Sequence, residues 1–383
     1  MKKLRGSVLF TTLSLLVVLA GPETIQVLTE VQRGDRPQIL SVFDRVPTVQ
    51  NLRGYERELE DTSRIVTALR PWIQYAQFML LEDAGRKASI GLDGWLFYKP
   101  GVAYCCERVR LEGSPKPGSS ALPAIIGFRD QLEARNIRLL VVPGPNKESV
   151  YPEKLTRRAE SIQAALCPST RALLEGLRAA GIEVVDLFRL FVDAKRADSG
   201  QGKPLYLVQD SHWSPAGLTL AARAVASRLL GSGWVHRGGV RYEERAAPVE
   251  RIGDLVRMFQ VPKIERHFLP EEIPCVRVVR QADGAPYADD PNAEILLLGD
   301  SFLRVFERDE PGAAGFTAHL AKELEQPLAS IVSDGGASTL VRQQLYRRPE
   351  LLAKKKVVIW QFVERDIRDG AEGWQNVPLP PLP

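Results

Sequence analysis

The sequence predicts an α/β domain, with a parallel sheet flanked by helices, that follows a helical stem near the N-terminus. Two observations predict this fold class: an ordinary globular composition, and short apolar runs that alternate with amphipathic stretches over most of the chain. Of the 383 residues, 44% are hydrophobic and 26% are charged, which favours neither a disordered chain nor a protein with several membrane spans. A chain of this length has room for one large domain or two smaller ones.

The charge of the chain argues against one class of partner. The formal net charge is +4, and the basic residues are scattered along the sequence instead of forming one stripe or tail. Nucleic-acid binding typically uses a clustered basic surface, so we expect no nucleic-acid partner.

The first element is an export signal. Lys2, Lys3 and Arg5 precede an apolar stretch at residues 8–20, which is the arrangement of a positive region followed by a short hydrophobic region. We expect residues 1–28 to be a signal peptide or a signal anchor, with the uncleaved anchor preferred. This interpretation predicts a periplasmic protein that is tethered to the inner membrane. A buried helix of a cytosolic protein is the alternative, but it has no need of the flanking positive charges.

Residues 29–89 are expected to form a helical stem close to the membrane. Leu59, Ile65, Val66 and Leu69 recur near helical spacing and predict a helix over residues 55–69. This stem contains no recognisable catalytic pattern.

The α/β domain is expected at residues 90–370. Runs rich in leucine and β-branched residues predict strands at residues 137–142, 182–187, 294–298, 328–332 and 356–362. Amphipathic stretches predict helices at residues 122–135, 169–180, 215–230, 315–324 and 338–347. This alternation is typical of α/β domains. Residues 236–290 are less regular and predict a loop-rich insertion or cover, and residues 371–383 predict an exposed proline-rich tail.

The four cysteines fit an oxidising compartment. Cys105, Cys106, Cys167 and Cys275 permit three pairings if all are bridged. Adjacent cysteines rarely bond with each other, so Cys105 or Cys106 is expected to reach Cys167 or Cys275. Buried free thiols are an equal alternative. We expect no metal, because neither a pair of cysteines nor a cysteine and a histidine have metal-ligand spacing.

The first chemical signal is Gly-Asp-Ser-Phe at residues 299–302, which follows an apolar strand directly. Ser301 then lies at the carboxyl end of a strand, where open α/β sheets bind ligands. Backbone N–H groups of the turn can hold an oxyanion there. A serine that only caps a helix explains the same pattern equally well.

The second signal is Asp-Ser-His-Trp at residues 210–213. In an extended segment, side chains two residues apart lie on one face, so the carboxylate of Asp210 reaches the ring of His212. That pairing fixes the tautomer whose other nitrogen accepts a proton from a serine hydroxyl. An Asp and a His that only cap the helix after Pro215 are the alternative. The Gly-Asp-Ser motif supplies the missing nucleophile and favours the catalytic interpretation.

Together these motifs resemble the AlgX and AlgJ branch of the SGNH hydrolase fold, the bacterial alginate O-acetyltransferases. Further similarity lies at residues 93–98, 142–147 with 151–152, 253–255, and 357–360 with 364–366, so it extends from about residue 90 to residue 369. The family places Asp and His before Ser, and this chain has the same order. The resemblance implies an SGNH hydrolase-like sheet in which Ser301 is the nucleophile, His212 the base and Asp210 its orienting partner.

The loops at the sheet edge hold further candidates. Gly335 and Gly336 follow the fourth predicted strand and are candidate oxyanion donors, with an ordinary glycine turn as the alternative. Lys147 is a candidate substrate contact, although most lysines only solvate a surface. Trp95 and Trp213 can stack on sugar rings, but we favour packing beside the motifs for both.

The resemblance implies a two-step acyl transfer that needs no cofactor. An acetyl group moves first to Ser301 and then to a hydroxyl of an exported polysaccharide, and a membrane-bound O-acyltransferase supplies it. Some family members have a further carbohydrate-binding domain, for which the residues after Asp369 leave no room, so the polymer is expected to bind at the catalytic groove or through a partner. Alginate itself is therefore not implied as the substrate. An acetylesterase with the same triad and a catalytically silent scaffold of an export complex are the other hypotheses.

Overall fold

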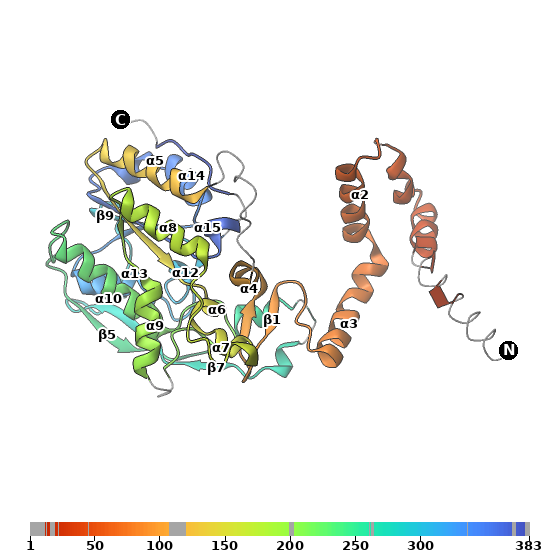
Figure 1. Ribbon diagram of the computed structural model, residues 1–383, viewed down its shortest axis with the longest axis horizontal. Helices are drawn as coiled ribbons and strands as arrows, with labels where there is room; N and C mark the ends of the chain where they lie inside the picture. Colours follow the sequence, from red (N-terminus) through yellow and green to blue (C-terminus); the bar gives the residue numbers. More distant parts are fainter. Residues whose placement is uncertain are drawn as a thin grey trace. The chain divides into compact units, whose positions relative to one another are not determined.

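The structure is a computed structural model that describes most of the chain. The described residues are 12, 14–15, 20–21, 23–44, 46–106, 120–198, 203–259, 261, 264–334, 336–369 and 373–379. The chain divides into two compact units, which are Met1–Gly85 with Gln260–Ile264, and Arg86–Phe259 with Glu265–Pro383 (Figure 1). The apolar stretch at residues 8–20 falls largely outside the described residues, and none of the described helices has the length and apolar character of a membrane span.

The N-terminal unit is helical. Its elements include η1 (Gln38–Asp44), α2 (Val49–Thr62) and α3 (Arg64–Leu81). The prediction of one helix over residues 55–69 is wrong, because the backbone of Ser63 is extended, with a ψ of 115°, and separates α2 from α3. The hydroxyl of Ser63 accepts a hydrogen bond from the N–H of Val66 at 3.3 Å, so it caps the start of α3.

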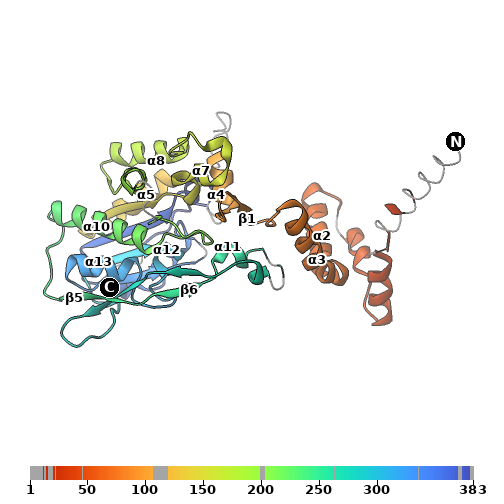
Figure 2. The same ribbon diagram turned by 90° about the horizontal axis from the view of Figure 1, so that it is seen from below.

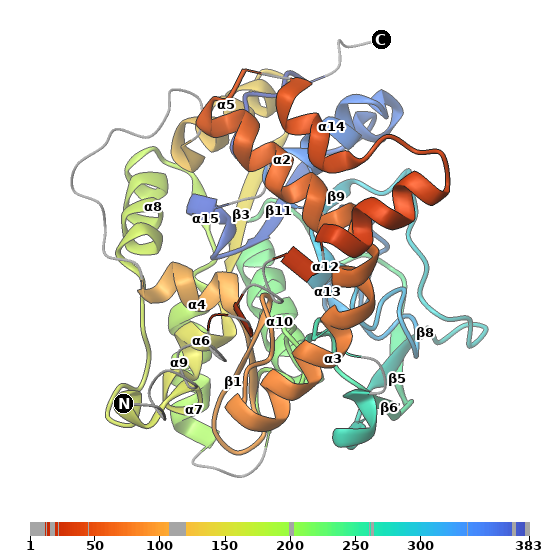
Figure 3. The ribbon, with the colours of Figure 1, turned by 90° about the vertical axis from the view of Figure 1, so that its right-hand side faces the viewer.

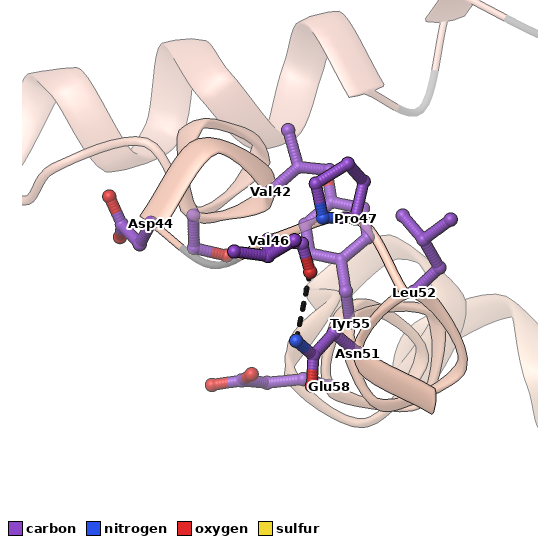
Figure 4. A pocket seen from close by; sticks show the side chains of 9 residues that line it. Val42, Asp44, Val46, Pro47, Asn51, Leu52, Tyr55 and Glu58 are labelled. Carbon is purple, nitrogen blue, oxygen red and sulfur yellow. Dashed lines mark hydrogen bonds between the residues drawn. The ribbon is translucent and has the colours of Figure 1, made fainter. Parts of the chain in front are cut away.

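A small pocket lies between η1 and α2 (Figure 4). Two of its polar side chains already have backbone partners. The amide of Asn51 donates to the carbonyl of Val46 at 2.8 Å, and the hydroxyl of Tyr55 donates to the carbonyl of Ile39 at 3.1 Å. The residues that line this pocket include no histidine, so they provide no serine–histidine pair for acyl transfer.

The C-terminal unit is built on a five-stranded sheet with the order β10-β9-β11-β3-β4. The strands are β3 (Arg138–Gly144), β4 (Glu183–Val184), β9 (Ile295–Gly299), β10 (Ala329–Val332) and β11 (Val357–Val363). All neighbouring pairs are parallel, so the predicted fold class is confirmed. β4 is shorter than the predicted strand because the chain turns after Val184 and enters α9 (Leu187–Asp198).

Different helices cover the two faces of the sheet, because consecutive side chains of a strand point to opposite sides. Leu297 and Ile359 share one apolar cluster with α10 and α13, whereas Leu298 and Trp360 share another with α5, α8 and α14. Figure 2 shows α5 and α8 on one side and α10 and α13 on the other. The helix bounds are α5 (Ala121–Glu133), α8 (Pro168–Ala179), α10 (Pro215–Gly231), α13 (Phe316–Leu324) and α14 (Leu340–Tyr346).

Residues 236–290 are more regular than the sequence predicts. They contain two antiparallel ribbons, in which β5 (Tyr242–Ala246) pairs with β8 (Val276–Arg280), and β6 (Val249–Arg251) pairs with β7 (Glu271–Ile273). The short helix α11 (Asp254–Arg257) follows β6. These strands are short and rich in charged residues, so they lack the apolar alternation that identifies a strand in a sequence.

Short elements complete the structure. They are β1 (Ala88–Ile90), β2 (Leu96–Tyr98), α4 (Lys99–Cys106), α6 (Lys147–Val150), α7 (Pro152–Leu155), η2 (Arg157–Ala159), η3 (Ile264–His267), α12 (Ser301–Arg304), η4 (Pro349–Leu352) and α15 (Asp366–Asp369).

The four cysteines are all described, and all are free thiols. Cys167 and Cys275 are buried, Cys106 is exposed, and the thiol of Cys105 lies 3.1 Å from the hydroxyl of Ser149. This arrangement corresponds to the free-thiol alternative.

The carboxyl ends of β9, β11 and β3 lie at one edge of the sheet, because these neighbouring strands are parallel (Figure 3). Ser301 follows β9 and Lys147 follows β3, so two of the predicted site residues lie at this edge of the sheet. Ligands of open α/β sheets bind at such an edge.

Candidate active site

Ser301 lies at a tight turn between a buried strand and a short helix. β9 ends at Gly299, where a Cβ atom would lie 2.4 Å from Cδ1 of the buried Leu303, so a larger residue would displace this side chain. The carboxylate of Asp300 accepts a hydrogen bond from the N–H of Phe302 at 2.9 Å and fixes the first turn of α12. The local sequence therefore holds Ser301 at the carboxyl end of β9.

The structure brings the three predicted triad residues into one hydrogen-bonded chain. Nε2 of His212 lies 2.8 Å from Oγ of Ser301, although the two residues are 89 positions apart in the sequence. Nδ1 of His212 lies 2.6 Å from Oδ1 of Asp210. An ionised Asp210 can only accept, so Nδ1 donates to it and Nε2 accepts from the hydroxyl of Ser301. A general base needs this geometry.

Burial and neighbouring charges act in opposite directions on the Asp210–His212 pair. Burial disfavours the charged form of Asp210, but the ring of His212 and the guanidinium of Arg251 outweigh it and lower the pKa of this carboxyl. Nη2 of Arg251 lies 3.2 Å from Oδ2 of Asp210. Burial also disfavours a charged His212, but the carboxylates of Asp210 and Asp254 outweigh it and raise the pKa of the ring. Asp210 therefore stays ionised and stabilises an imidazolium.

Lys147 does not fit the expectation of a substrate contact. Its side chain is 3% exposed. Its ammonium group donates to the carbonyls of Leu96, Val208 and Asp210, at 2.6, 2.8 and 3.1 Å. An ammonium group has three donors, so all of them are used within the protein. Lys147 therefore holds the chain segment that contains Asp210. It does not meet substrate because it is buried beneath that segment.

Glu271 of β7 holds the same segment by accepting hydrogen bonds from the N–H groups of that segment. Its carboxylate accepts from the N–H of Val208 at 2.7 Å and from the N–H of Gln209 at 3.2 Å. Residues 208–212 form no regular helix or strand. Side chains from other elements therefore replace the hydrogen bonds that a helix or a strand would supply.

The two tryptophans pack beside the motifs, which is the arrangement that the sequence favoured. Trp213 is fully buried, and its Nε1 donates to the carbonyl of Phe302 at 3.1 Å. The ring centroids of Trp95 and Tyr151 lie 4.8 Å apart. Trp213 thus links the histidine segment to the turn that contains the nucleophile.

The structure favours another oxyanion donor than the two glycines that the sequence suggested. Gly335 lies outside the described residues. The N–H of Gly336 donates to the carbonyl of Ser333 at 3.3 Å, so it closes a glycine turn and is not free to bind an oxyanion. Within the described part of the chain, the N–H of Ser301 has no acceptor, and it begins α12. This N–H is therefore available to an oxyanion that forms at Ser301.

Sequence reasoning gave no role to Arg251 or Asp254, although both contact the triad. The carboxylate of Asp254 accepts from the N–H of Ser211 at 2.7 Å and from its hydroxyl at 2.6 Å. Oδ2 of Asp254 also lies 3.6 Å from Nδ1 of His212. The Gly-Asp-Leu similarity at residues 253–255 was the available signal, but a similarity alone does not show what a side chain contacts.

The carboxylates near His212 also raise the question of a metal. Ligand atoms of Asp210, His212 and Asp254 lie within 4.8 Å of one another, which is close enough to surround one cation. However, Nδ1 of His212 already donates to Asp210, and the guanidinium of Arg251 already supplies a positive charge beside it. A cation would have to displace both interactions, so this donor set suits proton transfer better than metal binding.

Comparison with known proteins gives a family match over most of the chain. Residues 88–364 match the family described as an SGNH hydrolase-like domain, acetyltransferase AlgX. The chain is 26% identical over 286 residues to the probable alginate O-acetylase AlgJ of Azotobacter vinelandii, which covers 72% of this chain and 68% of that protein. It is 25% identical over 317 residues to the probable alginate O-acetylase AlgJ of Pseudomonas fluorescens, which covers 78% of this chain and 74% of that protein.

Two solved structures have a similar fold. The O-acetyltransferase domain of Pseudomonas putida AlgJ aligns with a TM-score of 0.55 and 22% identity, over 74% of this chain and 92% of that one. Pseudomonas aeruginosa AlgX aligns with a TM-score of 0.53 and 19% identity, over 72% of this chain and 61% of that one. These similarities confirm the SGNH hydrolase-like fold that the motifs implied.

Proposed function

This chain belongs to the AlgX family of SGNH hydrolase-like acetyltransferase domains, and we propose that it is an O-acetyltransferase that moves an acetyl group through Ser301 to hydroxyls of an exported polysaccharide. One observation carries the proposal, which is the continuous hydrogen-bonded chain from Ser301 through His212 to Asp210. The two contacts, at 2.6 and 2.8 Å, are short enough for hydrogen bonds.

The first step is acetylation of the serine. Nε2 of His212 takes the proton of the Ser301 hydroxyl while Oγ attacks the carbonyl carbon of an acetyl donor. The N–H of Ser301 donates to the oxyanion that forms. The intermediate then collapses, the donor's bond to the acetyl group breaks, and the imidazolium of His212 gives its proton to the departing oxygen. Asp210 stabilises the imidazolium throughout this step.

The second step reverses these roles. A sugar hydroxyl enters the same place, and neutral His212 removes its proton while its oxygen attacks the acetyl-serine. The bond between Oγ of Ser301 and the acetyl carbon breaks, and the proton held by His212 returns to the serine. The acetyl ester now lies on the sugar, and the triad is restored for another cycle.

The names of the relatives support the acceptor class. The AlgJ proteins of Azotobacter vinelandii and Pseudomonas fluorescens are described as probable alginate O-acetylases, which act on a polysaccharide. We extend the polysaccharide class to this chain and leave the polymer unspecified. The proposal includes a membrane-bound O-acyltransferase as acetyl supplier, which the resemblance to the AlgX and AlgJ branch implies. The basic and apolar residues at the N-terminus suit it, because they favour a periplasmic enzyme tethered to the inner membrane.

The test is transfer from an activated acetyl ester to an oligosaccharide. Purified protein is incubated with 4-nitrophenyl acetate, with and without an oligosaccharide that carries free hydroxyls, and the sugar is analysed by mass spectrometry. We expect acetylated sugar from the wild-type protein and none from Ser301→Ala. Hydrolysis that is unaffected by every sugar, with no acetylated product, would indicate an acetylesterase instead.

A second experiment separates an enzyme from a silent scaffold. In cells that make the acetylated polymer, Ser301→Ala is expected to abolish polymer acetylation while the abundance of the protein stays unchanged. Unchanged acetylation in this variant would contradict the proposed enzyme and support a scaffold.

A further inference from the structure

We infer that Asp254 is a second positioning carboxylate for His212, which stabilises the imidazolium together with Asp210 and fixes the segment that contains both triad residues. This inference rests on the proposed function, because it concerns the base of the same reaction. Nothing in the family match or in the names of the relatives assigns a role to Asp254.

The contacts of Asp254 reach both the ring and the backbone of the histidine segment. Oδ2 of Asp254 lies 3.6 Å from Nδ1 of His212, on the side of the ring that Asp210 also faces. Both oxygens of Asp254 accept from Ser211, the residue between Asp210 and His212. The N–H of Asp254 donates to Oδ2 of Asp210 at 3.1 Å. Asp254 therefore contacts every residue of the Asp-Ser-His motif.

Gly253 makes this close approach possible. A Cβ atom at residue 253 would lie 2.0 Å from the carbonyl oxygen of Gln209 and 2.8 Å from the backbone nitrogen of Asp210. Both are backbone atoms, so the segment itself would have to shift to admit a Cβ atom. The Gly-Asp pair thus presses the start of α11 against the triad segment, and only glycine fits at the contact.

The charges around the ring decide what Asp254 adds. His212 faces the carboxylates of Asp210, Asp254 and Asp300, which all favour its protonated form against burial. Arg251 offsets the charge of Asp210 directly, since it lies 3.2 Å from Oδ2 of that residue. Lys147 and Glu271 also interact electrostatically with Asp210. Arg251 partly offsets Asp210, so an ionised Asp254 contributes negative charge beside Nδ1. Burial, and after it the charge of Asp210, raise the pKa of Asp254, so this contribution is present only above that raised pKa.

The sign of the pH effect follows from the role of the base. His212 must be neutral to accept a proton, so the acetylation rate falls as the pH falls through the pKa of its ring. Loss of a negative charge beside the ring lowers that pKa. The acid limb of the pH profile in Asp254→Asn is therefore expected to lie at lower pH than in the wild type.

Glu271→Gln is the matched control. Glu271 also accepts backbone N–H groups of the histidine segment, but its contacts are with Val208 and Gln209, and it is not among the largest causes of the pKa shift of His212. If Asp254 acted only by holding the backbone, both variants would lose rate with an unshifted acid limb. An electrostatic role predicts a shift in Asp254→Asn alone.

The experiment combines a pH profile with a direct titration. The full chain is labelled with ¹⁵N-histidine, the ring signal of His212 is assigned with His212→Gln, and its pKa is measured by NMR in each variant. We expect Asp254→Asn to lower the pKa of His212 and to reduce the rate of Ser301 acetylation by 4-nitrophenyl acetate about tenfold. We expect Glu271→Gln to leave the pKa of His212 unchanged. Asp254→Ala, which removes the same charge, is the second variant if Asp254→Asn does not fold.

An unshifted His212 titration in a folded Asp254 variant would overturn the inference. So would an equal shift in Glu271→Gln, because the effect would then belong to the segment and not to Asp254. The NMR titration does not require activity, so an inactive wild-type protein would contradict the proposed function and leave this measurement valid.

Discussion

The nucleophile and the base of the site are held by two different kinds of structure. Ser301 follows β9, a fully buried strand that pairs with a parallel strand on each side. His212 follows an irregular segment whose backbone is held by Lys147, Asp254 and Glu271. The nucleophile side therefore depends on apolar burial and strand pairing, whereas the base side depends on charged groups that come from other elements.

This difference has a consequence for mutation. A change beneath Ser301 disturbs the sheet and should affect stability and activity together. A change around His212 disturbs contacts that the sheet does not need, so it should affect activity more than folding. The following predictions test that contrast, from the largest expected effect to the smallest.

Asp210→Asn should cause the largest loss of activity with little change in fold. The amide cannot fix the tautomer that leaves Nε2 as the acceptor, and it does not stabilise an imidazolium, so we expect the acetylation rate to fall about 10,000-fold. The measurement is Ser301 acetylation by an activated ester, with circular dichroism as the control for folding. A folded variant with more than a tenth of the wild-type rate would show that Asp210 is not the partner of the base.

Gly253→Ala and Gly299→Ala compare the two sides directly. Both added Cβ atoms clash, at 2.0 Å from the carbonyl oxygen of Gln209 and at 2.4 Å from Leu303, respectively. We expect Gly253→Ala to shift the histidine segment and cost about 100-fold in rate with a nearly unchanged denaturation midpoint. Gly299→Ala lies in the buried sheet and should lower both the acetylation rate and the denaturation midpoint. Equal destabilisation of the two variants in urea would contradict the contrast.

Glu307→Gln tests the nucleophile side through pH. Burial raises the pKa of Glu307 to about 8, and its carboxylate accepts the N–H of Ala318 at 2.9 Å. The folded state thus keeps a proton that the unfolded state releases above its ordinary pKa. Unfolding free energy is therefore lost as the pH rises from about 4.5 to about 8, and the variant should remove roughly 4 kcal/mol of this loss. Urea denaturation of both proteins at pH 5 and pH 8 measures it, and equal pH slopes would be the contrary result.

Trp213→Phe should have the smallest effect, because it removes one hydrogen bond and leaves most of the ring. The lost bond joins Nε1 of Trp213 to the carbonyl of Phe302 and connects the two sides of the site. We expect about 1 kcal/mol less unfolding free energy and a rate reduced a few-fold. If the rate fell as far as in Asp210→Asn, this tryptophan would have a role beyond connecting the two sides.

The same contrast explains what the sequence could predict. The five strands of the sheet and the position of Ser301 after β9 were predictable, because apolar runs and a Gly-Asp-Ser turn are local patterns. The Asp210–His212 contact was also predictable from their spacing of two residues.

The supports of the base were not predictable, because they are contacts between residues far apart in the sequence. Lys147 was expected to meet substrate, yet its three hydrogen bonds go to carbonyls of the protein. Asp254 comes from a segment whose short charged strands resemble loops, so nothing local marked it as a neighbour of His212. In the N-terminal unit, the break at Ser63 was missed because apolar spacing continues across it.

Trapping the acetyl group on the enzyme tests the central claim most directly. The purified protein is mixed with an activated acetyl ester without an acceptor, quenched in acid and digested for peptide mass spectrometry. The account predicts an acetyl group on Ser301 in the wild-type protein, its absence in Ser301→Ala, and its loss when an acceptor oligosaccharide is added before the quench. Transfer of acetyl to the sugar by a folded Ser301→Ala variant, or an acetyl intermediate on another residue, would contradict it.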